Sequence, residues 1–140
     1  MKKKIVILGS TGSIGKTLIN ILAKDKKNIE IILLTANKNI KELLKQVKKF
    51  NVKNLIVTDQ KSFLLIKKHL KSKKINIYNN FGSLTSILNN LNIDYTMNAV
   101  SGLSGLEPTL KIIKYTKKIA IANKEAIICG WPLIYTKLKK

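Results

Sequence analysis

The sequence contains no arginine, so all of its basic residues are lysines. There are 27 lysines against 7 acidic residues, which gives a formal net charge of +20. A charge of this size is typical of proteins that bind nucleic acids or anionic membranes. However, base recognition and bidentate phosphate binding favour arginine, and the lysines here are scattered through every helical segment. We therefore interpret them as solvated helix faces and expect no nucleic-acid partner, although the positive field would attract anionic ligands.

Cysteine is also scarce, and long apolar runs are absent. Cys129 is the single cysteine, which excludes an internal disulfide and fits a reducing compartment such as the cytoplasm. No apolar run approaches the ~20 residues that a membrane span needs. The segment Met1–Lys4 leads directly into a short strand-like run. We therefore expect neither a signal peptide nor a membrane anchor, and a cytoplasmic location.

The few acidic residues exclude another class of site. They form no close pair at the expected strand ends, so we expect no hard-metal site in this chain. His69 lies among lysines in a helical segment, and Cys129 has neither a second cysteine nor a nearby histidine. We interpret both as without a catalytic or metal-binding role, and we identify no catalytic residue.

The length of 140 residues predicts one domain, residues 1–140. Short β-rich runs alternate with helical patterns along the whole chain. We expect strands at Lys4–Leu8, Glu30–Thr35, Asn54–Thr58, Ile75–Tyr78, Tyr95–Val100 and Lys118–Ala122. We expect helices at Gly12–Asp25, Ile40–Phe50, Gln60–Lys71, Ser83–Leu91 and Leu106–Tyr115, and from Lys124.

This alternation predicts the α/β class, with a Rossmann-type, doubly wound parallel sheet of about six strands and helices on both faces. Six strands in this alternation favour the strand order 3-2-1-4-5-6, with a ligand crevice at the carboxyl ends of strands one and four. Asp59 and Ser83 lie where helix N-caps are expected, and Pro108 falls in a first helical turn. Pro132 should end or kink the last helix.

A glycine-rich turn follows the first strand. The segment Gly9–Gly15 reads GSTGSIG, between an apolar run and an amphipathic helical pattern. Gly9 would allow a tight turn, Gly12 would let a pyrophosphate approach the backbone, and Gly15 would let the helix pack closely on the strand. The spacing G-x-x-G-x-x-G differs from the commonest dinucleotide fingerprint, so a purely structural turn remains the alternative to nucleotide binding.

Three further strand ends carry polar or small residues. After the second strand, Lys38 stands where NAD-binding sheets place an acid, which favours NADPH over NADH. Small residues at 98–105 follow the fifth strand and should line the same crevice. After the sixth strand, Asn123, Lys124 and Glu125 are either ligand contacts or an ordinary helix start with an asparagine cap.

Taken together, GSTGSIG, the ANKN turn at 36–39, the NAVSGLSGLEPT stretch at 98–109 and IANKEAIICG at 121–130 resemble 1-deoxy-D-xylulose 5-phosphate reductoisomerases. The resemblance covers the whole chain in order, and the NKE segment joined to GSTGSIG is its most specific part. It implies an NADPH-dependent oxidoreductase that uses Mg²⁺ or Mn²⁺ and acts as a homodimer. Such enzymes convert the phosphorylated sugar deoxyxylulose phosphate to 2-C-methyl-D-erythritol 4-phosphate in non-mevalonate isoprenoid biosynthesis.

The resemblance also implies roles for individual residues. Contacts to NADPH are implied for Thr11, Gly12, Ser13, Ile14, Asn37, Lys38, Asn39, Asn123 and Glu125, and a substrate contact for Lys124. The first four would meet the phosphates, residues 37–39 the adenosine 2′-phosphate, and Asn123 and Glu125 the nicotinamide half. Asn37 departs from many members, which have glycine there, but both residues accept a positive φ.

The metal ligands, mobile loop and C-terminal helical domain of the family have no counterpart in this chain. We therefore expect a cofactor-binding portion of such an enzyme that is inactive alone. Two alternatives remain open at this point. One is another NADPH-dependent Rossmann oxidoreductase, such as a semialdehyde dehydrogenase or a dihydrodipicolinate reductase. The other is a stand-alone nucleotide-binding or nucleic-acid-binding module, which only the charge favours.

Overall fold

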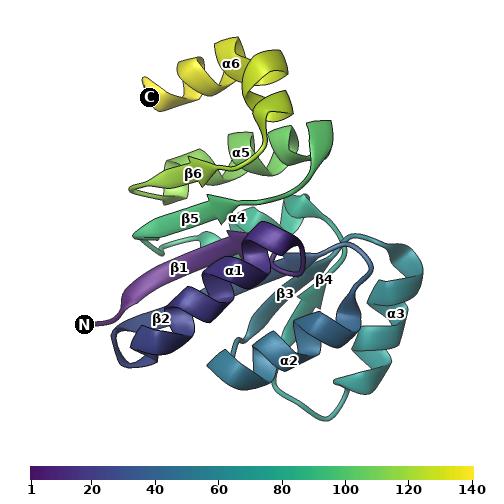
Figure 1. Cartoon of the computed structure of the whole chain (residues 1–140). Coiled ribbons are helices and arrows are strands. Elements are labelled where there is room, and N and C mark those ends of the chain that lie inside the picture. Colours follow the sequence, from purple (N-terminus) through teal and green to yellow (C-terminus); the bar gives the residue numbers. More distant parts are fainter.

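A six-stranded sheet, parallel throughout, organises the chain in the computed structural model, which describes all residues 1–140 (Figure 1). The strands are β1 Lys3–Leu8, β2 Ile29–Ala36, β3 Asn54–Val57, β4 Asn76–Tyr78, β5 Tyr95–Asn98 and β6 Ile119–Ile121. The α-helices are α1 Ser13–Leu22, α2 Ile40–Phe50, α3 Gln60–His69, α4 Leu84–Leu88, α5 Leu106–Ile112 and α6 Lys124–Leu138. Short 3₁₀ segments are η1 Ala23–Asn28, η2 Phe81–Ser83, η3 Gly102–Gly105 and η4 Ile113–Tyr115.

The six parallel strands and the helices on both faces confirm the predicted fold class, but the predicted strand order is wrong. The observed order is β4-β3-β2-β1-β5-β6. β4 extends the sheet beyond β3, and β5 returns to pair with β1. Their burial gives a reason: β4 is exposed or half-buried, as suits an edge, whereas Thr96 and Asn98 of β5 are fully buried. The chain therefore adds β2, β3 and β4 on one side of β1, and then adds β5 and β6 on the other side.

Two apolar layers hold the helices on the sheet. Alternate residues of a strand face opposite sides, so Ile5 and Ile7 join one core while Val6 and Leu8 join the other. The first core takes buried residues of α1, α2 and α3, such as Ile19, and the second takes those of α4 and α5. Full burial of such a side chain contributes about 1.5–3 kcal/mol, so these layers fix the sheet and its loops.

The helix starts agree in part with the sequence. Asp59 caps α3 by accepting a hydrogen bond from the Ser62 amide at 3.0 Å, as predicted. Pro108 lies in the first turn of α5, also as predicted. Ser83 precedes α4, but its hydroxyl donates to the Asn80 carbonyl at 2.6 Å instead of capping the helix.

The last helix, α6, continues across Pro132 to Leu138, so of the two expected effects of that proline, an end or a kink, the end is wrong. The proline removes one helical hydrogen bond, and the carbonyl left without it belongs to Ile128, an exposed residue that water can reach. α6 packs beside α5 at the β6 side of the sheet (Figure 1). No helix in the structure is both long and apolar enough to cross a bilayer.

Candidate functional site: a cleft at the carboxyl ends of the strands

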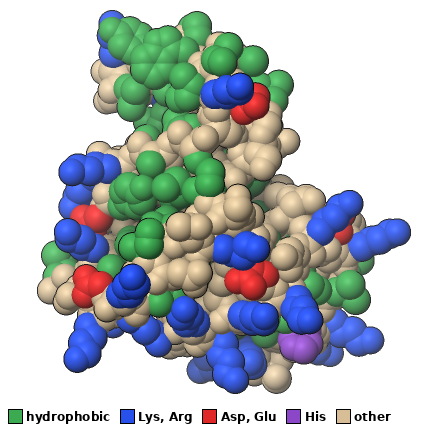
Figure 2. Space-filling view, viewed as in Figure 1, with side chains coloured by type: hydrophobic (Ala, Val, Ile, Leu, Met, Phe, Trp, Pro, Cys, Tyr) green, Lys and Arg blue, Asp and Glu red, His purple; other side chains and the backbone are tan.

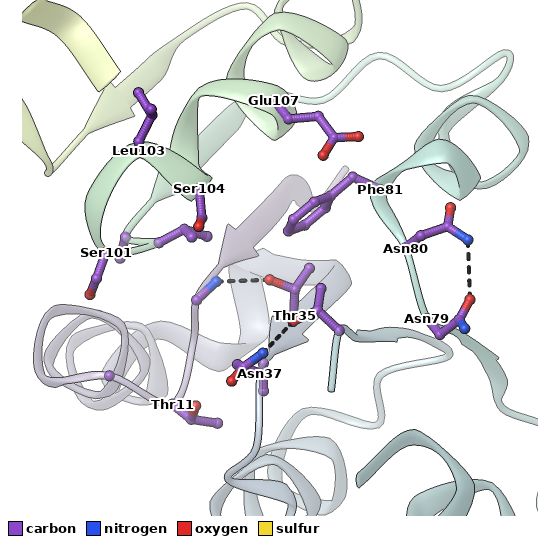
Figure 3. Close-up of a pocket in the computed structure, with 16 residues that line it drawn as sticks. Thr11, Thr35, Asn37, Asn79, Asn80, Phe81, Ser101, Leu103, Ser104 and Glu107 are labelled. Carbon is purple, nitrogen blue, oxygen red and sulfur yellow. Dashed lines mark hydrogen bonds between the residues drawn. The ribbon is translucent and has the colours of Figure 1, made fainter. Parts of the chain in front are cut away.

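A large cavity lies where the carboxyl ends of the parallel strands meet, which is where open α/β sheets bind ligands. It is an open cleft of about 1000 Å³ lined by residues that follow β1, β2, β3, β4 and β5 and by the first turn of α5. Figure 3 shows Thr11 and Ser101 on one side of it, with Asn79 and Asn80 on the other. The cleft spans the switch point between β1 and β5, not that between strands one and four.

The glycine turn forms the floor of the cleft. Gly9 has a φ of +75°, and a Cβ there would lie 2.8 Å from the Ala99 carbonyl oxygen. A Cβ on Gly15 would overlap the Gly9 carbonyl, so α1 packs against the turn as closely as predicted. Gly12 is different, because the nearest atom to a Cβ there is 3.8 Å away. The space over Gly12 is open, as an approaching ligand would require.

Hydrogen bonds on two sides fix the turn to its neighbours. The Gly9 amide donates to Thr35 Oγ1 at 2.8 Å, and the Ser10 amide donates to the Thr35 carbonyl at 2.9 Å. On the other side, Gln46 Nε2 of α2 donates to the Ser10 carbonyl at 2.9 Å. Ser10, Thr35 and Gln46 are all buried, so this small polar network is shielded from water and holds the turn rigidly.

The first turn of α1 has two features that suit an anion. The hydrogen bond from the Lys16 amide to the Gly12 carbonyl is 2.9 Å long and opens the helical series. The backbone amides of residues 13–15 therefore have no acceptor within the helix. They form the positive end of the helix dipole. Gly12, Ser13 and Ile14 are exposed there. A phosphate group bound at this point would meet both features.

The segment after β2 forms the next part of the cleft. Asn37 lines it and donates from Nδ2 to Thr58 Oγ1 at 2.8 Å. Lys38 is exposed, and Asn39 caps α2 by accepting from the Glu42 amide at 3.1 Å. Hydrogen bonds from the Ser62 amide and hydroxyl hold the pKa of Asp59 below its ordinary value, and Lys38 adds a smaller lowering. Lys38 is thus an exposed cation directly after Asn37, and its charge reaches the carboxylate of Asp59.

The loop after β5 forms the wall nearest β6. Its residues Val100, Ser101, Leu103 and Ser104 line the cleft, as predicted for the fifth strand end. The neighbouring Asn123 caps α6, because its Oδ1 accepts from the Ala126 amide at 2.8 Å. Its Nδ2 donates to the carbonyls of Val100 and Gly102. The helix-cap interpretation of Asn123 is therefore confirmed, while a ligand contact stays a prediction.

The cleft brings together only some of the residues singled out from the sequence. Thr11, Gly12 and Asn37 line it, and Ser13 and Ile14 follow directly on the first turn of α1. The others do not line it, and they are Lys38, Asn39, Asn123, Lys124 and Glu125. Four of these five are exposed, and Asn123 is half-buried behind the wall.

Sequence reasoning missed the side of the cleft opposite the glycine turn. Asn79, Asn80 and Phe81 follow β4, and Thr58 follows β3. Asn80 Nδ2 donates to Asn79 Oδ1 at 3.1 Å, and Asn79 Nδ2 donates to Gln60 Oε1 at 3.0 Å. The paired asparagines directly after a strand were the available signal, since strand ends in a parallel sheet share one edge.

The charges around the cleft are sparse. Glu107 is the one acidic residue that lines it, and it pairs with Lys111 on the same helix at 3.6 Å. No group of three histidine, cysteine, aspartate or glutamate residues lies close enough to hold a metal ion. The open floor over Gly12, the free first-turn amides of α1 and the nearby Lys38 together fit an elongated anionic ligand.

This chain is similar to known proteins in both sequence and structure. The sequence model of the 1-deoxy-D-xylulose 5-phosphate reductoisomerase family matches residues 5–130. The reductoisomerase of Pelagibacter ubique (strain HTCC1062) is 63% identical over 139 residues, and that of Thermotoga maritima (strain ATCC 43589 / DSM 3109 / JCM 10099 / NBRC 100826 / MSB8) is 37% identical over 139 residues. Each match covers 99% of this chain, but only 36% and 35% of those proteins.

Solved structures give the same relationship. The reductoisomerase of Zymomonas mobilis, solved in complex with NADPH, superposes with a TM-score of 0.88 at 28% identity. That match covers 99% of this chain and 36% of the solved chain. A reductoisomerase in complex with NADPH, fosmidomycin and magnesium superposes with a TM-score of 0.87 at 24% identity, over 98% of this chain and 34% of that one, and supports the fold. The chain thus spans about a third of the proteins it matches.

Proposed function

The chain belongs to the 1-deoxy-D-xylulose 5-phosphate reductoisomerase family, and from this premise we propose that it is the NADPH-binding portion of such an enzyme. The observation that carries the proposal is the open cleft over Gly12 at the β1–β5 switch point, with the first-turn amides of α1 beside it. The relative from Zymomonas mobilis was solved with NADPH, and its fold matches this chain throughout.

The phosphate end of the cofactor is assigned to the glycine turn. Thr11 and Gly12 line the cleft, while Ser13 and Ile14 supply first-turn amides of α1. In the proposal these backbone groups donate hydrogen bonds to the pyrophosphate, and the helix dipole adds a favourable interaction of about 0.3–1 kcal/mol. The network of Thr35 and Gln46 holds the turn in place before the cofactor arrives.

The adenosine 2′-phosphate is assigned to the segment after β2. No acid occupies the place where NAD-binding sheets hold the ribose hydroxyls, and Lys38 stands there instead. Asn37 and Asn39 flank it, with Asn37 at the cleft surface. The ammonium of Lys38 would pair with the phosphate dianion, so the proposal predicts a preference for NADPH over NADH.

The nicotinamide end is assigned to the side of the cleft near β6. NADPH, when bound, supplies the hydride of the reduction. Glu125 and Asn123 stand at the start of α6, close to the loop after β5, and Lys124 would bind the phosphorylated sugar substrate. A lysine at the substrate oxygens stabilises the negative charge that develops on them.

The remaining parts of the activity belong, in this proposal, to the two thirds of the relatives that this chain does not span. Residues 1–140 form one NADPH-binding domain, and the Mg²⁺ or Mn²⁺ ligands and the C-terminal helical domain lie in the other part. The complete enzyme would be a cytoplasmic homodimer that converts deoxyxylulose phosphate to 2-C-methyl-D-erythritol 4-phosphate in isoprenoid biosynthesis. No nucleic-acid or membrane partner is part of the proposal.

The outer face of α6 supports the assignment of further domains to the rest of the polypeptide. Ile128, Trp131, Tyr135 and Leu138 are all exposed there, while Ala126, Gly130 and Ile134 of the opposite face are buried. Figure 2 shows the apolar side chains gathered at this end of the molecule. A helix that is apolar on both sides is normally covered on both. We propose that the remainder of the reductoisomerase polypeptide covers it.

Titration of the 140-residue chain with NADPH and with NADH tests the function. We expect saturable binding of one NADPH per chain and weaker binding of NADH. The chain should show no deoxyxylulose-phosphate-dependent oxidation of NADPH, with or without Mn²⁺. Absence of NADPH binding would contradict the cofactor assignment, and measurable turnover would contradict the assignment of the metal site to the other part of the relatives.

A further inference from the structure

One wall of the cleft is a short loop that contains no strand or α-helix. Residues 100–105, here called the β5 loop, place Val100, Ser101, Leu103 and Ser104 on the cleft surface. The loop includes Gly102 with a φ of +67° and the short 3₁₀ segment η3. Ordering such a loop costs conformational entropy, so whatever holds it before a ligand binds also affects the affinity.

Asn98 holds the loop from inside the protein. It is fully buried at the end of β5, and its Oδ1 accepts from the Val100 amide at 3.1 Å. Its Nδ2 donates to the Gly105 carbonyl at 2.8 Å and to Thr109 Oγ1 at 2.6 Å. The Thr109 hydroxyl in turn donates to the same Gly105 carbonyl at 2.8 Å. Both ends of the loop are therefore fastened to one buried side chain.

Asn123 holds the middle of the loop from the side of α6. Its Nδ2 donates to the Gly102 carbonyl at 2.8 Å and to the Val100 carbonyl. Its Oδ1 accepts from the Ala126 amide at the start of α6. The fit is close, because a Cβ on Gly105 would lie 2.5 Å from that Nδ2.

The amide nitrogen of Asn123 is directed at the β5 loop. An asparagine amide has two N–H donors, and both are used on the loop carbonyls. Asn98 is 0% exposed and does not line the cleft. Neither side chain, as placed, donates a hydrogen bond into the cleft.

We propose that Asn98 and Asn123 are positioning residues that pre-form the β5 loop as a wall of the cofactor cleft, and that Asn123 acts on the cofactor through this loop. The inference rests on the proposed function, since it concerns the affinity for NADPH. To the cofactor contact that the resemblance implies for Asn123, it adds a second role, exerted through the loop. It also adds Asn98, which is fully buried and does not line the cleft.

The substitution Asn123→Asp separates the capping of α6 from the hydrogen bonds to the β5 loop. An aspartate still accepts a hydrogen bond from the Ala126 amide and caps α6, but it cannot donate to the loop carbonyls.

Thr109→Val removes the hydroxyl that joins Asn98 to Gly105 and leaves a side chain of similar shape. Asn98→Ala is the more severe version of that change. Asn89→Asp is the matched control, since Asn89 is exposed at the end of α4 and makes the same change of charge.

Two measurements on each variant test the proposal. The first is amide hydrogen exchange of the peptide covering 98–106 in the cofactor-free chain, and the second is the dissociation constant for NADPH. We expect Asn123→Asp and Thr109→Val to exchange faster in this peptide and to bind NADPH about tenfold more weakly, as loss of one or two hydrogen bonds predicts. Asn89→Asp should match the unsubstituted chain in both.

Each other outcome contradicts the proposal in a distinct way. Weaker NADPH binding by Asn123→Asp with unchanged exchange, and no effect of Thr109→Val, would make Asn123 a direct ligand. Faster exchange with unchanged affinity would show that the order of the loop does not matter for binding. If the unsubstituted chain binds no NADPH, the proposed function itself fails, and the exchange data still show whether the two asparagines hold the loop.

Discussion

The Thr35 hydroxyl oxygen accepts a hydrogen bond from the Gly9 amide at 2.8 Å, and so joins the end of β2 to the glycine turn after β1. The Ser10 amide bonds the carbonyl of the same threonine at 2.9 Å. Thr35 is buried between two strands whose other inward residues are apolar. Its hydroxyl group therefore holds the turn in place, and in our account the turn binds the cofactor phosphates.

Replacing Thr35 tests this link. In Thr35→Val the Gly9 amide loses its acceptor, so we expect the free energy of unfolding to fall by about 1–3 kcal/mol. The affinity for NADPH should fall as well, because the turn is no longer fixed. Thr35→Ser keeps the hydroxyl and should retain most of the affinity. Denaturant unfolding and NADPH titration check both variants, and equal behaviour of the two would contradict the role of the hydroxyl.

The two glycines Gly12 and Gly15 should respond differently to alanine. A Cβ on Gly15 would overlap the Gly9 carbonyl, so Gly15→Ala should destabilise the fold by about 1–3 kcal/mol. Gly12 has a φ of −75° and open space around it, so Gly12→Ala should leave stability within about 0.5 kcal/mol.

The Gly12 variant should nevertheless bind NADPH more weakly, because its methyl group would occupy the space that we assign to the pyrophosphate. Thermal unfolding and NADPH titration of both variants check the pair. A Gly12→Ala chain that binds NADPH as tightly as the unsubstituted chain would place the phosphates elsewhere.

Lys38 should determine the choice between the two nicotinamide cofactors. In Lys38→Ala we expect about tenfold weaker NADPH binding, the effect of losing one charge-assisted hydrogen bond, and unchanged NADH binding. Lys41→Ala, an exposed lysine on the first turn of α2, is the matched control for the change of charge. Equal losses for NADPH and NADH, or equal effects of the two substitutions, would show that Lys38 does not recognise the 2′-phosphate.

Asp94 should make the stability of the chain sensitive to acid. The ammonium group of Lys117, 2.6 Å away, and the Lys4 amide at 2.9 Å hold the pKa of Asp94 below its ordinary value. A lowered folded-state pKa gives a contribution that is complete above the unfolded value of about 4 and is lost as the pH falls through the folded value.

Thermal unfolding between about pH 2 and 6 checks this effect. Asp94→Asn should unfold at a lower temperature than the unsubstituted chain near pH 6, and the difference should shrink toward pH 2. A constant difference across the range would show that the ionisation of Asp94 does not contribute. Asp59 also has a lowered pKa, so Asp59→Asn should show an additional acid-sensitive contribution.

The sequence predicted those features that depend on local pattern. Alternating apolar residues such as Ile5 and Ile7 marked the strands, and the glycine spacing located the turn with Gly9 and Gly15 in the roles expected of them. The strand order was not predictable in this way, because a crossover does not reveal on which side of the sheet the chain continues. The exposure that marks β4 as an edge strand is visible only in the structure.

Parts of the site were hidden for a related reason. Thr35 and Asn98 look like ordinary polar residues near strand ends, and only the fold brings them to the Gly9 amide and the Gly105 carbonyl. Asn79 and Asn80 are far from the glycine turn along the chain but face the same cleft. Asn123 was correctly placed at a helix start, whereas its bonds to the β5 loop required the packing of α6 beside that loop.

Amide chemical shifts of the ¹⁵N-labelled chain during titration with NADPH test the central claim most directly. We predict saturable shifts at Thr11, Gly12 and Ser13, at Asn37 and Lys38, and in the β5 loop, with the lysine-rich outer surfaces of α2 and α3 unaffected. NADH should leave the shifts at Asn37 and Lys38 smaller. Shifts that spread over the lysine surfaces and vanish in moderate salt, with none at the glycine turn, would contradict a cofactor site in this cleft.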